Sequence, residues 1–272
     1  PLIFAEPRLR ELFDRYDVIE TTGERLPDLP AETLAEARYL IGQPPMDEAL
    51  LERMASLRCV FNVEGNLLPN MPYEAAFRRG IHVVTTAGAF AEPVAELGLG
   101  LALSLARGIH EAHADFRAGR ERWGLEGNEG ARLLSGSTVG IVGMGALGQA
   151  LARLLAGFRP RLLAYDPWQA PSVTRALGAE PVALDALLAE AETVFVTAAA
   201  TDENEGFLGA EALARMRPGA SLVLLSRAGV VDFDALAEAV AAGRIRAASD
   251  VWPEEPMPAD HPVRAMPGFL LS

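Results

Sequence analysis

Three glycines, Gly143, Gly145 and Gly148, have a spacing that can bind phosphate. They form the pattern G-x-G-x-x-G directly after an apolar stretch typical of a buried strand, and the residues that follow them are helical in character. Gly143 would permit a tight turn, Gly145 would let the backbone approach a pyrophosphate, and Gly148 would let the helix pack on the strand. The amides of Ala146 and Leu147 would point at the phosphates from the helix N-terminus. The spacing therefore predicts a dinucleotide site.

An acidic residue, Asp166, stands at the end of the next predicted strand. A carboxylate at this place accepts hydrogen bonds from the ribose 2′-hydroxyl and repels a 2′-phosphate, which favours NAD over NADP. The alternative is that Asp166 and Pro167 only begin a turn. Because the strand, the glycines, the helix and the acid occur in the expected order, we predict NAD as the cofactor and no metal.

These residues need a frame of alternating strands and helices, and the chain shows one from Thr138 onward. Near-continuous apolar strands separated by helical stretches indicate a parallel sheet with helices on both faces, an α/β fold of the Rossmann type. Ligands of such sheets bind at the carboxyl ends of the strands, where the predicted motifs fall. The predicted strands are 138–142, 161–165, 193–197, 221–225 and 245–249, and the clearest helices are 146–156, 211–216 and 233–242.

The first part of the chain consists of shorter predicted units. Strands are expected at 39–41, 58–63 and 81–84, and helices at 31–37, 47–55 and 73–79. Pro93 suits the first turn of a helix. The apolar pattern after it persists to about Ala118, which predicts one helix about 36 Å long, enough to connect two domains.

Composition excludes several classes of protein. Half of the residues are hydrophobic (50%) and the formal charge is −13, so nucleic acid and anionic membranes are poor partners. The longest apolar run, 97–106, is too short to cross a bilayer, and the N-terminus shows no signal-peptide pattern. Cys59 is the single cysteine and lies in an apolar stretch, so we expect a buried thiol and a cytoplasmic protein.

Several blocks resemble the D-isomer-specific 2-hydroxyacid dehydrogenase family, which includes phosphoglycerate dehydrogenase, glyoxylate/hydroxypyruvate reductase and D-lactate dehydrogenase. The resemblance implies a Rossmann NAD-binding domain and a smaller, flavodoxin-like α/β substrate domain. It implies a substrate domain at 1–91, an NAD-binding domain at 92–268, and the start of the return to the substrate domain at 269–272. The blocks that carry the resemblance are 79–83, 93–96, 137–143, 216–232 and 243–256.

The resemblance also implies roles for individual residues. Arg227 would bind the carboxylate and carbonyl oxygen of a 2-keto acid, and a guanidinium suits that bidentate contact. Glu255 would raise the pKa of a catalytic histidine, and Asp250 would orient the nicotinamide carboxamide. Asn66 and Leu67 match the loop whose amides bind the substrate carboxylate. Without the resemblance, Arg227 and Glu255 would be interpreted as surface charges.

The chain departs from the family pattern at several places. The carboxylate loop of the family usually reads Gly-Val-Asp, but residues 64–69 of this chain have a different sequence. The usual His-x-Pro is replaced by Thr197-Ala-Ala, and Ala228 stands where the family has a glycine. The family's catalytic histidine falls just beyond Ser272, so we expect the natural protein to continue past this residue with a histidine that pairs with Glu255. His261 is the nearest substitute in the chain and a weak one.

The sequence therefore predicts an NAD-dependent D-2-hydroxyacid dehydrogenase that works as a 2-keto-acid reductase. The resemblance implies a homodimer formed through the nucleotide domain and its long helix. The alternative is an NAD-sensing interaction protein, similar to the family's corepressors. Formate dehydrogenase is disfavoured because that branch has Gln in place of Glu255. The sequence does not identify which 2-hydroxy acid is the substrate.

Overall fold

The computed structural model describes residues 4–63, 65, 67, 70–201 and 203–272. The chain divides into two compact units, Pro1–Ala89 and Phe90–Ser272. Both are α/β units with parallel sheets, so the predicted fold class is confirmed.

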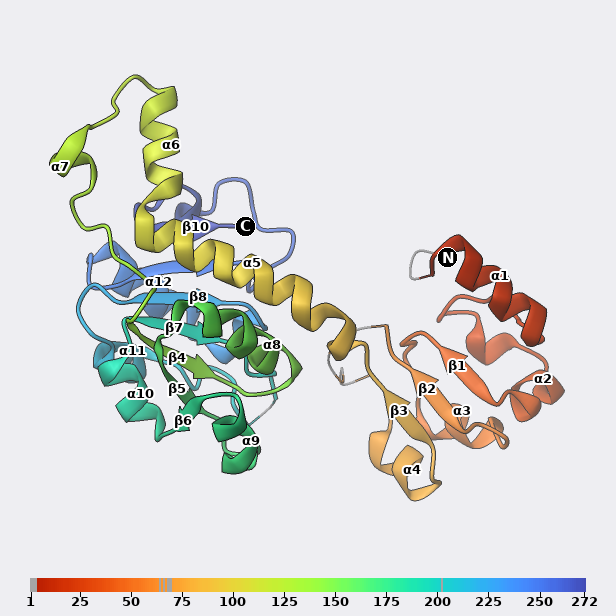
Figure 1. The fold of residues 1–272 in the computed structure, drawn as a ribbon. Coiled ribbons are helices and arrows are strands. Elements are labelled where there is room, and N and C mark those ends of the chain that lie inside the picture. The colour runs from red at the N-terminus through yellow and green to blue at the C-terminus, as the bar shows by residue number, and fades with distance from the viewer. Residues whose placement is uncertain (1–3, 64, 66, 68–69, 202) are drawn as a thin grey trace. The chain divides into compact units, whose positions relative to one another are not determined.

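The larger unit is built on a seven-stranded parallel sheet with the order β10-β9-β8-β7-β4-β5-β6 (Figure 1). The chain order reverses between β4 and β7, which makes this the topological switch point where such sheets bind nucleotides. The central strands are almost entirely buried and largely apolar, as expected for a sheet covered on both faces. The strands are β4 Thr138–Val142, β5 Arg161–Tyr165, β6 Ala179–Pro181, β7 Thr193–Val196, β8 Ser221–Leu224, β9 Arg246–Ser249 and β10 Phe269–Leu271.

Helices cover both faces of this sheet and create two separate cores. Successive side chains of β8 alternate between them: Leu222 and Leu224 pack in one core, Val223 in the other. Residues of α5 and α8 belong to the second core and residues of α10, α11 and α12 to the first. The helices are α5 Ala87–Arg107, α6 Ile109–Arg117, α7 Gly124–Gly127, α8 Ala146–Leu155, α9 Pro171–Ala176, α10 Leu184–Glu190, α11 Ala210–Arg215 and α12 Phe233–Ala241, with 3-10 turns η2 Ala156–Phe158, η3 Ala228–Val230 and η4 Pro262–Ala265.

The smaller unit contains a three-stranded parallel sheet in the order β1-β2-β3. Its core lies on one side of the sheet and contains Val60 of β2, Leu51 of α3 and Ala76 of α4. The elements are α1 Glu6–Arg15, η1 Leu26–Asp28, α2 Ala31–Glu36, β1 Tyr39–Ile41, α3 Glu48–Arg53, β2 Cys59–Phe61, α4 Tyr73–Arg78 and β3 His82–Val84. Burial raises the pKa of the Cys59 thiol, in agreement with the buried thiol that the sequence predicts.

The long helix differs from the sequence prediction at both ends. It begins at Ala87, so Pro93 lies inside it rather than in its first turn. It ends at Arg107 because Gly108 adopts a left-handed conformation (φ 61°), and α6 starts in a new direction. The single helix predicted to reach about Ala118 is therefore wrong. Figure 1 shows α6 and α7 projecting from the sheet.

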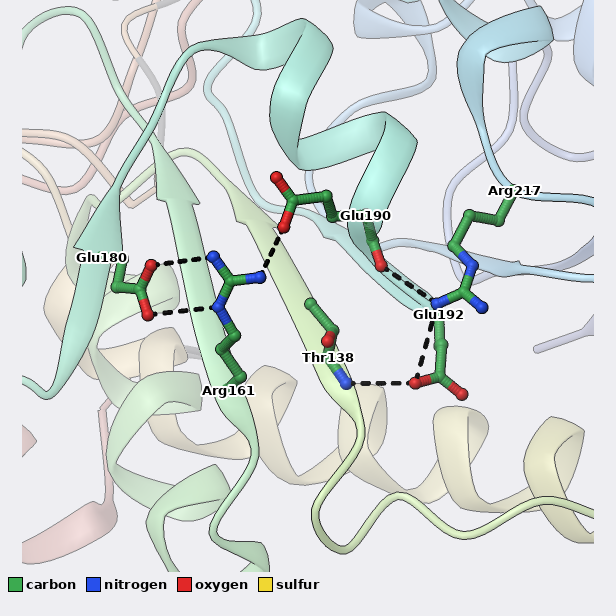
Figure 2. Close-up of polar contacts among 6 residues, drawn as sticks. All are labelled: Thr138, Arg161, Glu180, Glu190, Glu192 and Arg217. Atoms are coloured by element: carbon green, nitrogen blue, oxygen red, sulfur yellow. Dashed lines mark hydrogen bonds and ion pairs between the residues drawn. The ribbon is translucent and has the colours of Figure 1, made fainter.

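The amino ends of the strands carry a network of ion pairs (Figure 2). Arg161 of β5 donates two hydrogen bonds to Glu180 of β6 (3.2 and 3.0 Å) and contacts Glu190, and the bonds to Arg161 lower the pKa of Glu180. Glu192 accepts a hydrogen bond from the backbone amide of Thr138 (3.3 Å). These side chains are half exposed, so the network contributes little to stability. The network lies at the amino ends of the strands, opposite the carboxyl ends where the cofactor site is predicted.

One described helix, α5, is long and apolar enough to span a membrane by length and composition. Its buried residues Ala95, Leu101 and Leu105 pack in a core of the larger unit together with β4 and α8. This packing accounts for its apolar character.

Candidate cofactor and substrate site

The glycine turn after β4 is held tightly against the end of β7. Gly143 has φ 99°, and a Cβ atom there would lie 2.5 Å from the backbone nitrogen of Ala198, so only glycine fits. The hydroxyl of Thr197 donates a hydrogen bond to the Gly143 carbonyl oxygen (2.6 Å). The turn at the switch point is therefore fixed by both backbone geometry and a side chain.

The other two glycines have different surroundings. A Cβ atom on Gly148 would lie 2.1 Å from the Gly143 carbonyl oxygen, so this glycine allows α8 to pack on the turn. A Cβ atom on Gly145 would meet no described heavy atom within 4 Å. Gly145 precedes α8, and no described side chain caps this helix. The amides of Ala146 and Leu147 at its first turn are thus placed as an anion site requires.

Asp166 follows β5 and holds two segments together. Its Oδ2 accepts a hydrogen bond from the amide of Met144 in the glycine turn (2.7 Å). Its Oδ1 accepts from the amides of Trp168 and Gln169 (2.8 and 3.0 Å). These bonds fix the carboxylate beside the glycine turn. The interpretation of Asp166 as merely the start of a turn is incomplete, because the residue also holds the glycine turn through the Met144 amide.

Two other predicted residues follow β8 and β9, which are neighbours in the sheet. Arg227 comes after β8 and Asp250 directly after β9. The Oδ1 atom of Asp250 is buried and has no hydrogen-bond partner among the described residues. Burial raises the pKa of the Asp250 carboxyl, and the charge of Glu255 adds to this effect. A buried acceptor without a partner suits a ligand with an N–H donor, such as a carboxamide.

Glu255 lies on the loop after β9 and is exposed. Its Oε1 accepts a hydrogen bond from the amide of Trp252 (3.0 Å), and the Trp252 indole donates to the Ser272 carbonyl oxygen (3.4 Å). The loop that carries Glu255 thus lies beside the end of β10. The ring of His261 accepts a hydrogen bond from the amide of Val263 (3.3 Å) and caps η4, which explains this histidine structurally.

The structure brings together the predicted residues of the larger unit at the carboxyl ends of its strands: Gly143, Gly145, Ala146, Leu147, Gly148, Asp166, Arg227, Asp250 and Glu255. Leu67 belongs to the smaller unit, where it is exposed, and Asn66 lies outside the described residues. Among the described residues, no group of three His, Cys, Asp or Glu side chains could hold a metal.

The role of Thr197 was not predicted. In the sequence this residue is notable only because Thr197-Ala-Ala replaces the family's His-x-Pro. In the structure Thr197 is buried (7% exposed) and binds the carbonyl of the first glycine. The signal that could have found it is a single hydroxyl residue immediately after the apolar strand β7.

Comparison with known proteins identifies a family. The family model described as "D-isomer specific 2-hydroxyacid dehydrogenase, NAD binding domain" matches residues 99–272. A D-3-phosphoglycerate dehydrogenase of Mycobacterium leprae is 36% identical over 93% of this chain and 47% of its own length. A glyoxylate reductase of Aeropyrum pernix is 32% identical over 98% of this chain and 82% of its own length.

A solved structure is similar over the whole chain. The crystal structure of a phosphoglycerate oxidoreductase from Rhizobium etli has 54% sequence identity and a TM-score of 0.85, and the match covers 100% of this chain and 83% of that one. By contrast, this chain spans about half the length of the mycobacterial relative.

Proposed function

This chain belongs to the D-isomer specific 2-hydroxyacid dehydrogenase family, and we propose that it is an NAD-dependent reductase of small 2-keto acids. In this reaction a hydride passes from C4 of NADH to the keto carbon, and a proton passes to the keto oxygen. The products are a D-2-hydroxy acid and NAD⁺.

The observation that carries the proposal is the arrangement around Asp166. Its carboxylate is anchored on the Met144 amide next to Gly145, where a Cβ atom would meet nothing in the described structure. A pyrophosphate fits over Gly145 and the amides of α8, and the ribose hydroxyls fit the carboxylate. The cofactor would supply the hydride, and Asp250 would accept a hydrogen bond from its carboxamide and so fix the face of the ring.

The substrate side depends on Arg227. A guanidinium binds a carboxylate through two parallel hydrogen bonds and places the neighbouring keto oxygen close to a positive charge. This charge would stabilise the alkoxide that forms as the hydride arrives. A guanidinium stays charged in proteins and does not serve as a proton donor, so another group must protonate the alkoxide. We assign to Glu255 the role of a carboxylate that supports the proton donor, an imidazole, by raising its pKa.

Two measurements test this proposal. The first is steady-state turnover with NADH and a panel of 2-keto acids that includes glyoxylate, hydroxypyruvate and pyruvate. The second is fluorescence titration with NADH and NADPH. We expect turnover with at least one acid, and tighter binding of NADH, because a 2′-phosphate beside Asp166 would bring like charges together. Cofactor binding without any turnover would favour the NAD-sensing alternative, and tighter NADPH binding would refute the assigned role of Asp166.

The variant Asp166→Ala sharpens the cofactor test. Removal of the carboxylate takes away the hydrogen-bond acceptor for the ribose and the repulsion of a 2′-phosphate. The affinity for NADH should therefore fall, and the ratio of NADH to NADPH affinity should decrease. The matched control is Asp185→Ala, since this exposed acid on α10 pairs only with Arg215 among the described residues. The control should change neither affinity.

We also propose that the protein forms a homodimer through the projecting α6–α7 segment. This segment and the loop after it expose large apolar side chains, and Leu125 (94% exposed) and Trp123 (74%) are among them. Such groups on one projection are typical of an association surface. Analytical ultracentrifugation should give a dimer for the wild type and a monomer for a Trp123→Ser, Leu125→Ser double variant. The matched control is Trp168→Ser, at another exposed tryptophan (85%) outside the segment.

A further inference from the structure

The turn after β5 is built around one carboxylate. The amides of Trp168 and Gln169 donate to Oδ1 of Asp166 (2.8 and 3.0 Å), and the amide of Met144 donates to its Oδ2 (2.7 Å). The side-chain amide of Gln169 also donates to the Met144 carbonyl oxygen (3.2 Å). These bonds attach the turn to the glycine segment. They use only the backbone of Trp168, so the turn itself does not require a tryptophan there.

The side chain of Trp168 has almost no packing partner within the unit. It is 85% exposed. Its indole makes no ring contact and no hydrogen bond with any described residue. Tryptophan is highly buried on average, and its ring carries a large apolar surface. The backbone of Trp168 is therefore held at the predicted cofactor site, while most of its ring surface remains available for a ligand.

Trp168 is also the only aromatic residue in the sequence of the loops around Asp166. These loops are 143–145 after β4, 166–170 after β5 and 182–183 after β6, together with 197–201, the first residues after β7. The four strands are consecutive neighbours in the sheet, in the order β7-β4-β5-β6. A purine that lies over these loops thus finds a flat ring partner only at Trp168.

The covalent structure of a dinucleotide brings its adenine to the same carboxylate. The group assigned to Asp166 is the 2′-hydroxyl of the adenosine ribose, and the adenine is bonded to the neighbouring ribose carbon. A carboxylate has about four lone-pair sites, and three of those of Asp166 are used by the amides of Met144, Trp168 and Gln169. Little hydrogen-bonding capacity is left for the ribose, so the adenosine half gains most from a contact of another kind.

We propose that the indole of Trp168 stacks on the adenine of the bound dinucleotide and supplies much of the affinity for its adenosine half. The proposal rests on dinucleotide binding at Gly145 and Asp166, which is part of the proposed function. It does not depend on which 2-keto acid is reduced.

The experiment measures binding by isothermal titration calorimetry with three probes. These are NADH, ADP-ribose, which lacks the nicotinamide, and reduced nicotinamide mononucleotide, which lacks the adenosine. One base stacked on an aromatic ring is worth roughly a 5-fold to 150-fold change in affinity, so Trp168→Ala should weaken NADH and ADP-ribose at least about fivefold. The affinity for the mononucleotide should stay the same, and Trp168→Phe, which keeps a ring, should retain most of the affinity for ADP-ribose. Unchanged binding of ADP-ribose by Trp168→Ala would overturn the proposal.

A second measurement detects the stack directly. Acrylamide quenches the fluorescence of exposed tryptophans, and a stacked adenine would shield the Trp168 ring from it. Saturating ADP-ribose should therefore reduce acrylamide quenching in the wild type but not in Trp168→Phe. An equal reduction in both proteins would show that ADP-ribose shields another tryptophan, and the assignment to Trp168 would be wrong.

The matched control is Trp123→Ala, at an exposed tryptophan (74%) of the same unit that lies outside the loops around Asp166. This variant should bind ADP-ribose as the wild type does. Trp168→Ala should keep the wild-type melting temperature, because exposed side chains contribute little to stability, so weaker binding would not reflect unfolding. Weaker ADP-ribose binding in Trp123→Ala equal to that in Trp168→Ala would contradict a specific stack.

Failure of this inference and failure of the proposed function give different results. If no 2-keto acid is reduced but Trp168→Ala loses affinity for ADP-ribose, the reductase proposal fails and the stack is supported. If 2-keto acids are reduced and Trp168→Ala binds ADP-ribose and NADH like the wild type, the reductase proposal holds and the stack is refuted.

Discussion

The same substitution, Gly→Ala, should have different effects at two glycines of the dinucleotide motif. The structure separates their roles, because a Cβ atom on Gly145 would meet no described heavy atom within 4 Å, whereas one on Gly148 would lie 2.1 Å from a backbone oxygen. Gly145→Ala should therefore affect the ligand and Gly148→Ala the fold.

The expected magnitudes follow from these surroundings. In Gly148→Ala the clashing oxygen belongs to Gly143, which cannot retreat because Ala198 is packed against it. Overpacking of this kind costs about 1–3 kcal/mol, and we expect the upper end. For a unit of this size about 3 kcal/mol corresponds to a fall in melting temperature of roughly 6–12 °C. Gly145→Ala should leave the melting temperature unchanged and displace the pyrophosphate. The loss of one charge-assisted hydrogen bond, worth about 1.5–3 kcal/mol, weakens NADH binding roughly tenfold to a hundredfold.

The assays are thermal unfolding followed by circular dichroism and fluorescence titration with NADH. Gly100→Ala is the matched control, since Gly100 lies in α5 with open space around it and alanine there should raise helix stability by about 1 kcal/mol. The reasoning is refuted if Gly145→Ala lowers the melting temperature as much as Gly148→Ala does, or if its NADH affinity equals that of the wild type.

Substitutions at three further positions test the polar groups of the site. Arg227→Lys and Arg227→Ala should lower kcat/KM on the order of a hundredfold while the Kd for NADH stays within about twofold, because charge-assisted hydrogen bonds to the substrate are lost; a variant that keeps most of its activity would show a surface role. Asp250→Asn should raise the melting temperature near pH 7, since burial raises the pKa of Asp250 and the wild-type fold loses stability as the pH rises through that pKa. This gain should vanish below about pH 4, where the unfolded carboxyl is also protonated, and a gain independent of pH from 4 to 8 would contradict the assignment. Thr197→Val should destabilise the fold by about 1–3 kcal/mol because the Gly143 carbonyl loses its donor, whereas Thr197→Ser should not, and equal melting temperatures of the two variants would argue against this hydrogen bond.

The sequence predicted the central strands well and the edge of the sheet poorly. β4 and β5 have the predicted bounds, because their side chains are buried on both faces and leave a continuous apolar run. β6, Ala179–Pro181, was not predicted: it pairs with one neighbour, has three residues and exposes Glu180. A strand this short forms because it pairs with β5. Its own three residues show no alternation of apolar and polar side chains that would predict a strand.

The helix error has a comparable cause. The apolar pattern continues past Arg107 on both sides of Gly108, so periodicity alone could not mark the break. What ends α5 is the left-handed conformation of Gly108 together with contacts from elsewhere in the unit: the amide of Arg132 donates to the Ala106 carbonyl oxygen (2.7 Å) and Arg246 donates to that of Leu105 (2.7 Å). These partners lie far along the chain and replace the hydrogen bonds of a continued helix.

The two halves of the candidate site differed in predictability for a physical reason. The dinucleotide is bound by main-chain geometry, in which Gly143 and Gly148 are required by contacts of 2.5 and 2.1 Å that any side chain would violate, so the motif must appear in the sequence. The proposed substrate residue, Arg227, is by contrast a side chain on the loop after β8, where the fold itself requires no particular residue type. A single arginine in a loop forms no local pattern, so its proposed role came from the family resemblance and not from spacing. The cofactor motif can therefore be predicted from the sequence alone, whereas the substrate has to be identified by assay.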